Sequence, residues 1–494
     1  MPRRNVIGGA RRLARLLIGR RGKAFIIAPT CAMVKIYYTG TALMMTMMAA
    51  TLAGRLCRVL IPVVSKPLLQ RNLIRELHIM KLGEDQMSGV LRPGVRKLAD
   101  IFTSHGYELR VAGGAVRDML LGKVPQDLDF ATTATPEEMK AMFTEEGLRM
   151  LNMGGEKHGT VTVRLDEENF ECTTLRIDLV TDGRHAEVSF TKNWELDANR
   201  RDLTINAMFL GLDGTIYDYF QGSQHLEQRH VTFVGDADTR IKEDYLRILR
   251  YFRFYGRIAK EPDNHCPHIL DSIRANVDGL DRISGERIWV ELQKIITGNF
   301  GGELLVKMAE CGVGIHVGMP ETFNCANVKA VYERCQKAGL TPGDLHHMTL
   351  LASGLSSVEE CVKLIVRIKC SKREQELLLH IVQHRDAVAQ FTTLKEAKDH
   401  LVDLFIGEKK NKDIALLYTT ELLKYCGHMD LLKGIKEWEV PKFPVNGLLI
   451  GERGVPRKKI RFAMRDLLEE WKKSDYSFDA SELLDTLNLD MYGD

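Results

Sequence analysis

The chain is 494 residues long, more than one hydrophobic core usually organises, so two to four domains are expected. Its formal charge is only +3, but residues 1–75 contain 14 Lys or Arg and no acid, whereas residues 76–494 carry 55 basic against 66 acidic side chains, a net of −11. This distribution excludes a protein that is basic throughout. If the chain binds nucleic acid, it must do so through a local basic strip.

The acid-free start of the chain has the composition of a mitochondrial transit peptide, with arginines separated by apolar residues. Residues 36–54 are uncharged and long enough to raise the alternative of a membrane span. Their Thr and Gly content and their basic flanks favour a leader, so no stable membrane association is expected. We assign 1–79 as a mitochondrial targeting leader that directs the chain to the matrix. An internal start near Met80, where ordinary globular composition begins, would give a shorter cytoplasmic or nuclear form.

From about residue 91 to residue 218, short strand patterns alternate with helical ones, which predicts an α+β domain. Strands are expected over 159–164 and 169–175, and a helix over 136–145. The turn signal at 211–214 predicts a hairpin that leads into a strand over 215–220. After about residue 235 the strand signals fade, and amphipathic helices continue to the end of the chain.

The most informative pattern lies within residues 109–130. A short apolar strand ends at the Gly113-Gly114 turn, Ala115–Leu121 follows as a helix, and Asp127 and Asp129 stand in a second strand. Side chains two apart on a strand share a face, about 6.5–7 Å apart, and carboxylates so placed can bind Mg²⁺ ions about 3.5–4 Å apart. The glycines let backbone N–H groups approach a triphosphate. An isolated Asp-x-Asp is more often a solvated turn, but the order and compact spacing of these parts favour a metal site.

Residues 239–256 are expected to form one amphipathic helix with a core-facing apolar stripe. Asp244 and Arg247 lie just outside that stripe, one turn apart, so both can reach one object. A carboxylate only accepts hydrogen bonds and a guanidinium only donates them. The pair therefore fits the amine and ring nitrogen of cytosine or adenine and mismatches guanine and uracil, a discrimination of about 1–3 kcal/mol per bidentate contact. The alternative is a solvated Asp244–Arg247 ion pair of a few tenths of a kcal/mol.

Four segments, in order, resemble the class II tRNA nucleotidyltransferases, the CCA-adding enzymes of the DNA polymerase beta superfamily. Residues 113–118 with 127–129 resemble the first motif of that family, and residues 200–207 resemble its ribose- and nucleotide-binding motif. Residues 243–254 resemble its base-reading motif, and 283–292 its neck-stabilising helix. The resemblance is strong over about 91–298 and weaker in the tail, where Leu448-Leu449 replaces the usual Asp-hydrophobic pair.

The resemblance implies an α+β nucleotidyltransferase head with a small mixed β-sheet over 80–235. An all-α neck with the base-reading helix (236–300), a helical body (301–410) and a helical tail for tRNA binding (411–494) would follow. The implied reaction is template-independent addition of C, C and A to the 3′ end of tRNA from CTP and ATP, with Mg²⁺ as cofactor and pyrophosphate as product. Monomer and homodimer both remain open.

The same resemblance implies a role for each motif residue. Asp127 and Asp129 would be the catalytic metal ligands and would help to generate the 3′-alkoxide. The nucleotide would be bound in four places: at the phosphates, near phosphate and ribose, at the base, and at the pocket wall or again the phosphates. The residues implied for these places are, in that order, Gly114 and Arg117, Arg201 and Asp202, Asp244 and Arg247, and Arg250 and Arg253.

Two alternatives are weighed against this assignment. A bacterial-type poly(A) polymerase shares the head and neck motifs. Members of that group have a sequence similar to Gly-Arg-Arg-Phe-Arg where this chain has Gly-Glu-Lys-His-Gly, at 155–159. A non-catalytic RNA-binding adaptor on an inactive nucleotidyltransferase scaffold is the other. The presence of both aspartates and both base-reading residues argues against the adaptor.

Overall fold

The computed structural model describes residues 18–19, 23–27, 33–37 and 80–492, apart from 126, 152 and 182–185. The chain divides into two compact units, Met1–Leu77 and His78–Asp494, and each is considered by itself. In the first unit, β1 (Ile18–Gly19), β2 (Lys23–Ile27) and β3 (Met33–Tyr37) pair as an antiparallel sheet. Most of the predicted leader, including residues 38–54, lies outside the described residues. Among the residues that are described, no helix is long and apolar enough to cross a membrane.

The head of the second unit is built on an eight-stranded mixed sheet, larger than the few strands expected. Strands β6 and β9 run parallel, and every other neighbouring pair is antiparallel. β10 (Arg176–Thr181) and β11 (Ala186–Phe190) form a separate hairpin. The sheet order is β4 (Met80–Lys81), β13 (Thr215–Asp218), β12 (Met208–Gly211), β5 (Leu109–Ala112), β6 (Asp129–Thr132), β9 (Glu168–Thr174), β8 (Thr160–Leu165), β7 (Arg149–Leu151). The strands and the hairpin predicted from sequence are therefore confirmed.

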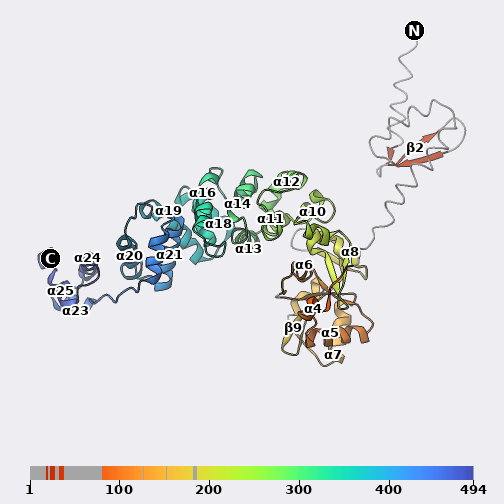
Figure 1. Cartoon of the computed structure of the whole chain (residues 1–494), viewed down its shortest axis with the longest axis horizontal. Helices are drawn as coiled ribbons and strands as arrows, with labels where there is room; N and C mark the ends of the chain where they lie inside the picture. The colour runs from red at the N-terminus through yellow and green to blue at the C-terminus, as the bar shows by residue number, and fades with distance from the viewer. Residues whose placement is uncertain are drawn as a thin grey trace, which may run out of the picture. The chain divides into compact units, whose positions relative to one another are not determined.

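Helices of the head pack apolar faces against this sheet (Figure 1). The helix predicted over 136–145 is confirmed as α7, where Thr135 caps the helix through the Glu138 N–H and Pro136 occupies the first turn. Phe102 of α5 meets Phe143 of α7 edge-on in the core, with ring centroids 5.8 Å apart. The head helices are α4 (Glu84–Ser88), α5 (Pro93–Ser104), α6 (Gly114–Leu120), α7 (Pro136–Glu145), α8 (Trp194–Asn199) and α9 (Gly222–Glu227), with the 3₁₀ turns η1 (Met153–His158) and η2 (Thr204–Asn206).

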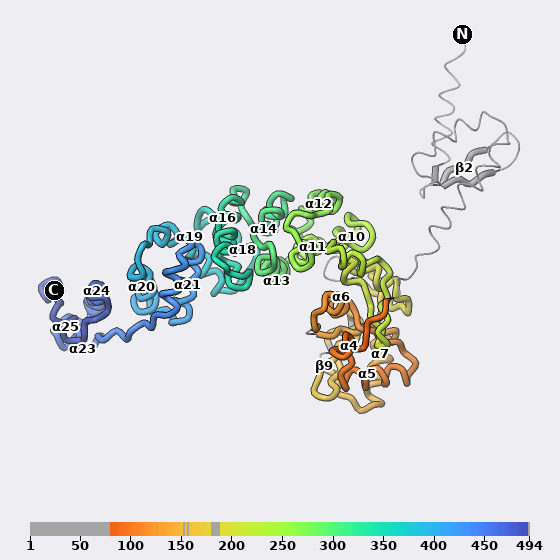
Figure 2. The backbone as a smooth tube through the Cα atoms, viewed as in Figure 1, coloured from red at the N-terminus to blue at the C-terminus, as the bar shows by residue number. Residues whose placement is uncertain are grey.

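Beyond β13 the described chain is helical to its end, as expected from the loss of strand signals. Figure 2 shows the backbone path, in which α11, α13 and α14 pack against one another. The elements are α10 (Ala237–Glu243), α11 (Leu246–Ile258), α12 (Pro267–Arg274), η3 (Val277–Arg282), α13 (Gly285–Ile296), α14 (Gly301–Glu310), α15 (Val313–His316), α16 (Cys325–Lys337), α17 (His347–Gly354), α18 (Val358–Ile368), α19 (Lys372–Val388), α20 (Leu394–Val402), η4 (Asp403–Gly407), α21 (Lys412–Cys426), α22 (Met429–Glu437), α23 (Gly447–Glu452), α24 (Ile460–Lys473), α25 (Ala480–Asp485) and η5 (Leu489–Tyr492).

The helical region contains two separate cores. One continuous core runs from the head through α22, and a second forms around Trp471 between α23, α24 and α25. The Leu448-Leu449 departure leaves α23 intact, because Asn446 Oδ1 accepts hydrogen bonds from the backbone N–H groups of both leucines, at 2.9 and 3.1 Å. The Leu448 side chain is exposed and takes no part in the second core.

Candidate active site

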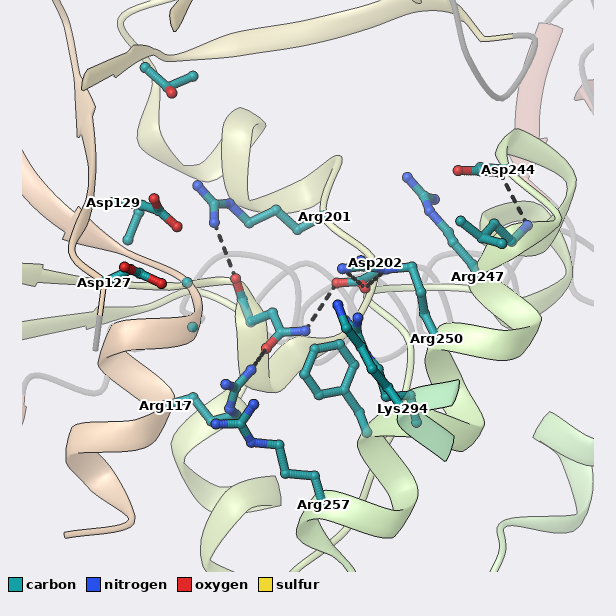
Figure 3. A pocket seen from close by; sticks show the side chains of 18 of the residues that line it. Arg117, Asp127, Asp129, Arg201, Asp202, Asp244, Arg247, Arg250, Arg257 and Lys294 are labelled. Atoms are coloured by element: carbon teal, nitrogen blue, oxygen red, sulfur yellow. Dashed lines mark hydrogen bonds and ion pairs between the residues drawn. The ribbon is translucent and has the colours of Figure 1, made fainter. Parts of the chain in front are cut away.

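The ten residues singled out in the sequence all line one open pocket of about 1320 Å³. The pocket is formed by the head on one side and by α11 and α13 on the other. Figure 3 shows Asp127 and Asp129 together on the head side, with Asp244 and Arg247 on the opposite side. Arg201, Asp202 and Arg250 lie between these two groups. The pocket therefore presents a carboxylate pair, a set of guanidinium groups and a second Asp–Arg pair.

The glycine turn is required by close packing. Gly113 has a φ of +63°, a backbone conformation that residues other than glycine rarely adopt. A Cβ at this position would lie 2.9 Å from Arg201 Nη1, so the turn also leaves room for that guanidinium. Gly114 then opens α6 and lines the pocket beside Arg117.

The two carboxylates of the predicted metal pair lie at the start of β6. Asp129 is the first residue of the strand, but Asp127 lies in a bend before it, so the expectation that both stand on one strand is wrong. The reason is that β6 pairs with β5 only from Phe130 onward, and the preceding residues are left to turn. Both side chains are exposed, and in the described part of the chain neither makes a hydrogen bond or ion pair. Protein atoms around Asp129 raise the pKa of its carboxyl, and the negative charge of Asp127 raises it further.

This donor set fits a hard divalent cation. The negative charges of Asp127 and Asp129 repel each other, and a bound cation would remove that repulsion. Glu171 of β9 stands directly beside Asp129 in the parallel pairing and also lines the pocket, a neighbour that sequence analysis did not assign to the site. Within the described residues, no group of three His, Cys, Asp or Glu is placed to hold a metal ion. Asp127 and Asp129, the pair predicted from sequence, remain the candidate ligands because both line the pocket.

Arg201 is held by an aspartate that sequence analysis missed. Asp197 of α8 is almost fully buried and accepts hydrogen bonds from Arg201 Nη2 at 3.1 Å and from Arg200 Nε at 2.8 Å. Burial alone would raise the pKa of Asp197, but the two guanidinium groups hold it below its usual value. Asp197 stands only three and four residues before these arginines, so an i,i+3/i+4 pattern was the available signal.

A buried hydrogen-bonded chain connects the head to α11. Arg117 Nη1 donates to Asn206 Oδ1 at 2.6 Å, and Asn206 Nδ2 donates to Asp202 Oδ1 at 3.3 Å. Arg250 of α11 then donates through Nε to Asp202 Oδ2 at 2.7 Å. Arg117 is 3% and Asp202 7% exposed, so both present little surface to a ligand. Asn206, which links them, was not among the predicted site residues.

Phe254 of α11 is an aromatic platform for the arginines of the pocket. The guanidinium carbons of Arg253, Arg117 and Arg250 lie 4.3, 4.9 and 5.6 Å from its ring centroid. Arg253 also pairs with the buried Glu291 of α13 at 3.0 Å. These contacts hold like charges close together in the pocket, an arrangement that suits an anionic ligand.

The helix expected over 239–256 is interrupted at Asp244. α10 ends at Glu243, Asp244 is extended with φ −152° and ψ 107°, and α11 begins at Leu246. The single-helix prediction is therefore wrong. At the break, Asp244 Oδ1 accepts from the N–H of Leu246, the first residue of α11, at 3.1 Å. The apolar stripe is otherwise confirmed, with Ile241, Ile248, Leu249 and Phe252 fully buried and Tyr245 partly buried.

Asp244 and Arg247 do not pair with each other; each is bound to different residues. Asp244 Oδ2 accepts from Arg287 Nη2 of α13 at 2.8 Å. Arg247 pairs with Glu243 and donates to the backbone carbonyls of Arg240 and Arg200, both at 3.0 Å. The alternative of an Asp244–Arg247 ion pair is therefore wrong. Neither Glu243 nor Arg287 was assigned to the site from sequence.

Two family models match the chain: the poly A polymerase head domain over residues 109–232, and the probable RNA and SrmB-binding site of polymerase A over residues 267–323. The mitochondrial CCA tRNA nucleotidyltransferase 1 of Danio rerio is 48% identical over 419 residues, covering 84% of this chain and 95% of that protein. Its Homo sapiens counterpart is 47% identical over 409 residues, covering 83% and 93%. A CCA-adding enzyme of Geobacillus thermodenitrificans is 39% identical over 231 residues, 46% of this chain and 55% of that protein.

Solved structures show the same fold. The CCA-adding enzyme of Bacillus stearothermophilus in complex with CTP superposes with a TM-score of 0.61 at 24% identity, covering 80% of this chain and 97% of that one. The Thermotoga maritima enzyme complexed with tRNA gives 0.60 at 20% identity, covering 82% and 98%. The α+β head followed by helical regions, expected from sequence, is thereby confirmed.

Proposed function

The chain belongs to the CCA tRNA nucleotidyltransferase family, and on that premise we propose which of its residues carry the reaction. The reaction is template-independent addition of C, C and A to the 3′ end of tRNA, with CTP and ATP as substrates and pyrophosphate as product. The observation that carries this assignment is 48% identity to a mitochondrial enzyme of that name across 95% of its length. The name of that relative argues against a bacterial-type poly(A) polymerase. The presence of both aspartates and both base-reading residues argues against an inactive adaptor.

Asp127 and Asp129 are proposed to hold Mg²⁺. A divalent cation bound there would lower the pKa of the tRNA 3′-hydroxyl and neutralise charge on the transferred phosphate. The support is chemical: two exposed carboxylate groups without a hydrogen-bond or ion-pair partner among the described residues stand side by side at the head end of the pocket. Carboxylate oxygen is the ligand that Mg²⁺ prefers.

The triphosphate is proposed to lie along the guanidinium groups between the two ends of the pocket. Arg201 is oriented toward it by Asp197, and Gly114 allows close approach of the backbone. Arg250 and Arg253 add positive charge from α11. Arg117 and Asp202 contribute by holding Asn206 and Arg250 in place, because their own side chains are nearly buried. The residues proposed to contact the phosphates are therefore fewer than expected from sequence, because Arg117 and Asp202 are left out.

The base is proposed to be read by Asp244 and Arg247. An ionised carboxylate has about four lone-pair sites, and two of those on Asp244 are used by the Leu246 N–H and Arg287. The remaining sites can accept the exocyclic amine of cytosine or adenine. Within the described residues the Arg247 Nε–H makes no hydrogen bond, so it can donate to the neighbouring ring nitrogen. Guanine and uracil present the reverse pattern and leave both groups unmatched.

We propose a mitochondrial matrix location for the full chain, with residues 1–79 as leader, and a cytoplasmic or nuclear form for a product that starts near Met80. The names of three animal relatives, each 47% or 48% identical to this chain, support the first part. The head is proposed to span 80–235, the neck 236–300, the body 301–410 and the tRNA-binding tail 411–494. The chain is proposed to act on tRNA as a monomer or a homodimer.

The test uses purified protein and tRNA that lacks its 3′ CCA, with each labelled nucleotide offered singly and then CTP with ATP. Wild type should add two C residues from CTP alone and complete CCA with both. Asp127→Ala and Asp129→Ala should each abolish transfer, whereas Asp271→Ala, an exposed aspartate of α12, should not. Chelation with EDTA should stop the reaction and Mg²⁺ should restore it. Activity within about tenfold of wild type in both pocket variants would contradict the metal assignment.

A further inference from the structure

Asp244 lies outside both helices, so a regular helical backbone does not fix the direction of its side chain. It lies in the extended link between α10 and α11, and only two groups contact its carboxylate in the described structure: the Leu246 N–H at 3.1 Å and Arg287 Nη2 at 2.8 Å. Arg287 is in the first turn of α13, 43 residues further along the chain, and it lines the same pocket. One carboxylate oxygen therefore depends on the backbone and the other on Arg287.

The backbone of this link is fixed by packing that does not involve Arg287. The Tyr245 ring lies against Gly279 of η3 so closely that a Cβ at Gly279 would come within 1.9 Å of Tyr245 Cδ1. Arg282 stands over the same ring at 5.6 Å from its centroid. Because Tyr245 anchors the link, removal of Arg287 is expected to leave the path of the main chain in place. What it would release is rotation of the Asp244 carboxylate.

We infer that Arg287 is a positioning residue for nucleotide selection, an inference that rests on the proposed base-reading role of Asp244. A guanidinium is a rigid planar donor, so its bond to Oδ2 fixes the plane of the carboxylate while the Leu246 N–H fixes Oδ1. The free lone pairs then point in a set direction, toward the amine of cytosine or adenine. Without Arg287 the carboxylate would sample orientations in which this contact is lost.

The Arg287–Asp244 pair is poorly suited to a purely stabilising role. The side chains are 30% and 21% exposed, so water screens their attraction. A second, more exposed pair is available on the same helix turn for comparison: Glu286 meets Lys369 at 3.1 Å, and both side chains are 59% exposed. Glu286→Gln removes that pair without touching the pocket and is the matched control.

The experiment measures kcat/KM for CTP, UTP, ATP and GTP on trimmed tRNA, together with the melting temperature, for the full chain. Arg287→Ala should lower the preference for CTP over UTP and for ATP over GTP by about fivefold or more, as a fraction of a bidentate base contact. Arg287→Lys, which keeps a positively charged donor group but not the planar guanidinium, should fall between Arg287→Ala and wild type. Glu286→Gln should keep the preferences of wild type.

A double-variant comparison separates this inference from the proposed function. In the Asp244→Ala background, Arg287→Ala should lower the preferences no further, because both changes remove the same contact. If Asp244→Ala leaves the preferences unchanged, the base-reading role fails and this inference with it. If Asp244→Ala changes them but Arg287→Ala and Arg287→Lys do not, only the inference is overturned. Equal losses for all four nucleotides would likewise overturn it and assign Arg287 to phosphate binding or to folding. If Arg287→Ala does not fold, Arg287→Lys decides among the same outcomes.

Discussion

Asp202→Asn removes one charge from the centre of the buried chain that joins the head to α11, at nearly constant shape. In the wild type, Asp202 Oδ2 accepts from Arg250 Nε at 2.7 Å, and Oδ1 accepts from the Leu203 N–H at 2.8 Å. Asparagine can keep the bond to Leu203 through its oxygen. Its amide nitrogen would then face Arg250, so two donors would oppose each other.

The expected cost follows from burial. Breaking a buried ion pair by removing one partner costs about 3–5 kcal/mol because a charge is left unpaired. The Arg250 side chain is 33% exposed, so water can solvate part of that charge, and we expect about 2–3 kcal/mol. For a cooperative unit of roughly 150–250 residues, this is a fall in melting temperature of about 4–12 °C.

The pH dependence has a defined sign. Burial alone would raise the pKa of Asp202, but Arg250 and the Leu203 N–H hold it below its usual value. A carboxyl whose pKa is lowered by folding contributes stability that is complete above its unfolded pKa of about 3.9 and is lost as the pH falls through the folded pKa. The stability difference between wild type and Asp202→Asn should therefore be constant near neutral pH and shrink below about pH 4.

Thermal unfolding followed by circular dichroism, in parallel with nucleotide addition to trimmed tRNA, checks this reasoning. Asp271→Asn, which breaks an exposed pair on α12, is the control and should change stability by less than about 0.5 kcal/mol. An Asp202→Asn protein that melts with wild type yet fails to add nucleotides would refute a holding role. The carboxylate would then act on the nucleotide directly.

Three further outcomes are expected. Gly113→Ala should cost about 1–3 kcal/mol of stability, because the residue has positive φ. Its Cβ would also displace Arg201, so kcat/KM should fall more than in the control Gly235→Ala, which has positive φ but open space around it. Equal kcat/KM in the two variants would argue against displacement of Arg201. Burial holds the pKa of His380 at about 3, below its unfolded value. The free energy of unfolding should therefore fall as the pH drops through about 6.5, by about 2 kcal/mol at pH 5 for this group. The difference between the urea midpoints at pH 7 and pH 5 should be smaller in His380→Phe than in wild type. The leader should be cleaved on import and a product starting near Met80 should stay outside mitochondria; a mitochondrial form that keeps residues 36–54 and resists carbonate extraction would support a membrane span.

Elements governed by local chemistry were predictable. Thr135, Pro136 and Glu138 mark the start of α7 by capping and by a fixed φ, and the structure begins the helix there. The hairpin at 211–214 followed from its glycines, and Gly214 indeed has a φ of +87°. The ten candidate site residues could also be found from sequence, because the motifs that carry them keep fixed order and spacing, and the structure gathers all ten around one pocket.

The sequence by itself determined the residue types of the site and the elements around it, because turns, caps and apolar periodicity act between residues a few positions apart. The tertiary structure decided which groups contact one another. A 3.6-residue repeat predicts one helix through Asp244, whereas in the structure Asp244 is extended and the next residue, Tyr245, packs against the distant Gly279. The bond from Arg117 to Asn206 spans 89 residues and that from Arg287 to Asp244 spans 43. The first pair meets only when α6 packs beside η2 in the head, and the second only when α13 packs beside α11. No local pattern encodes the distance between residues so far apart in the chain.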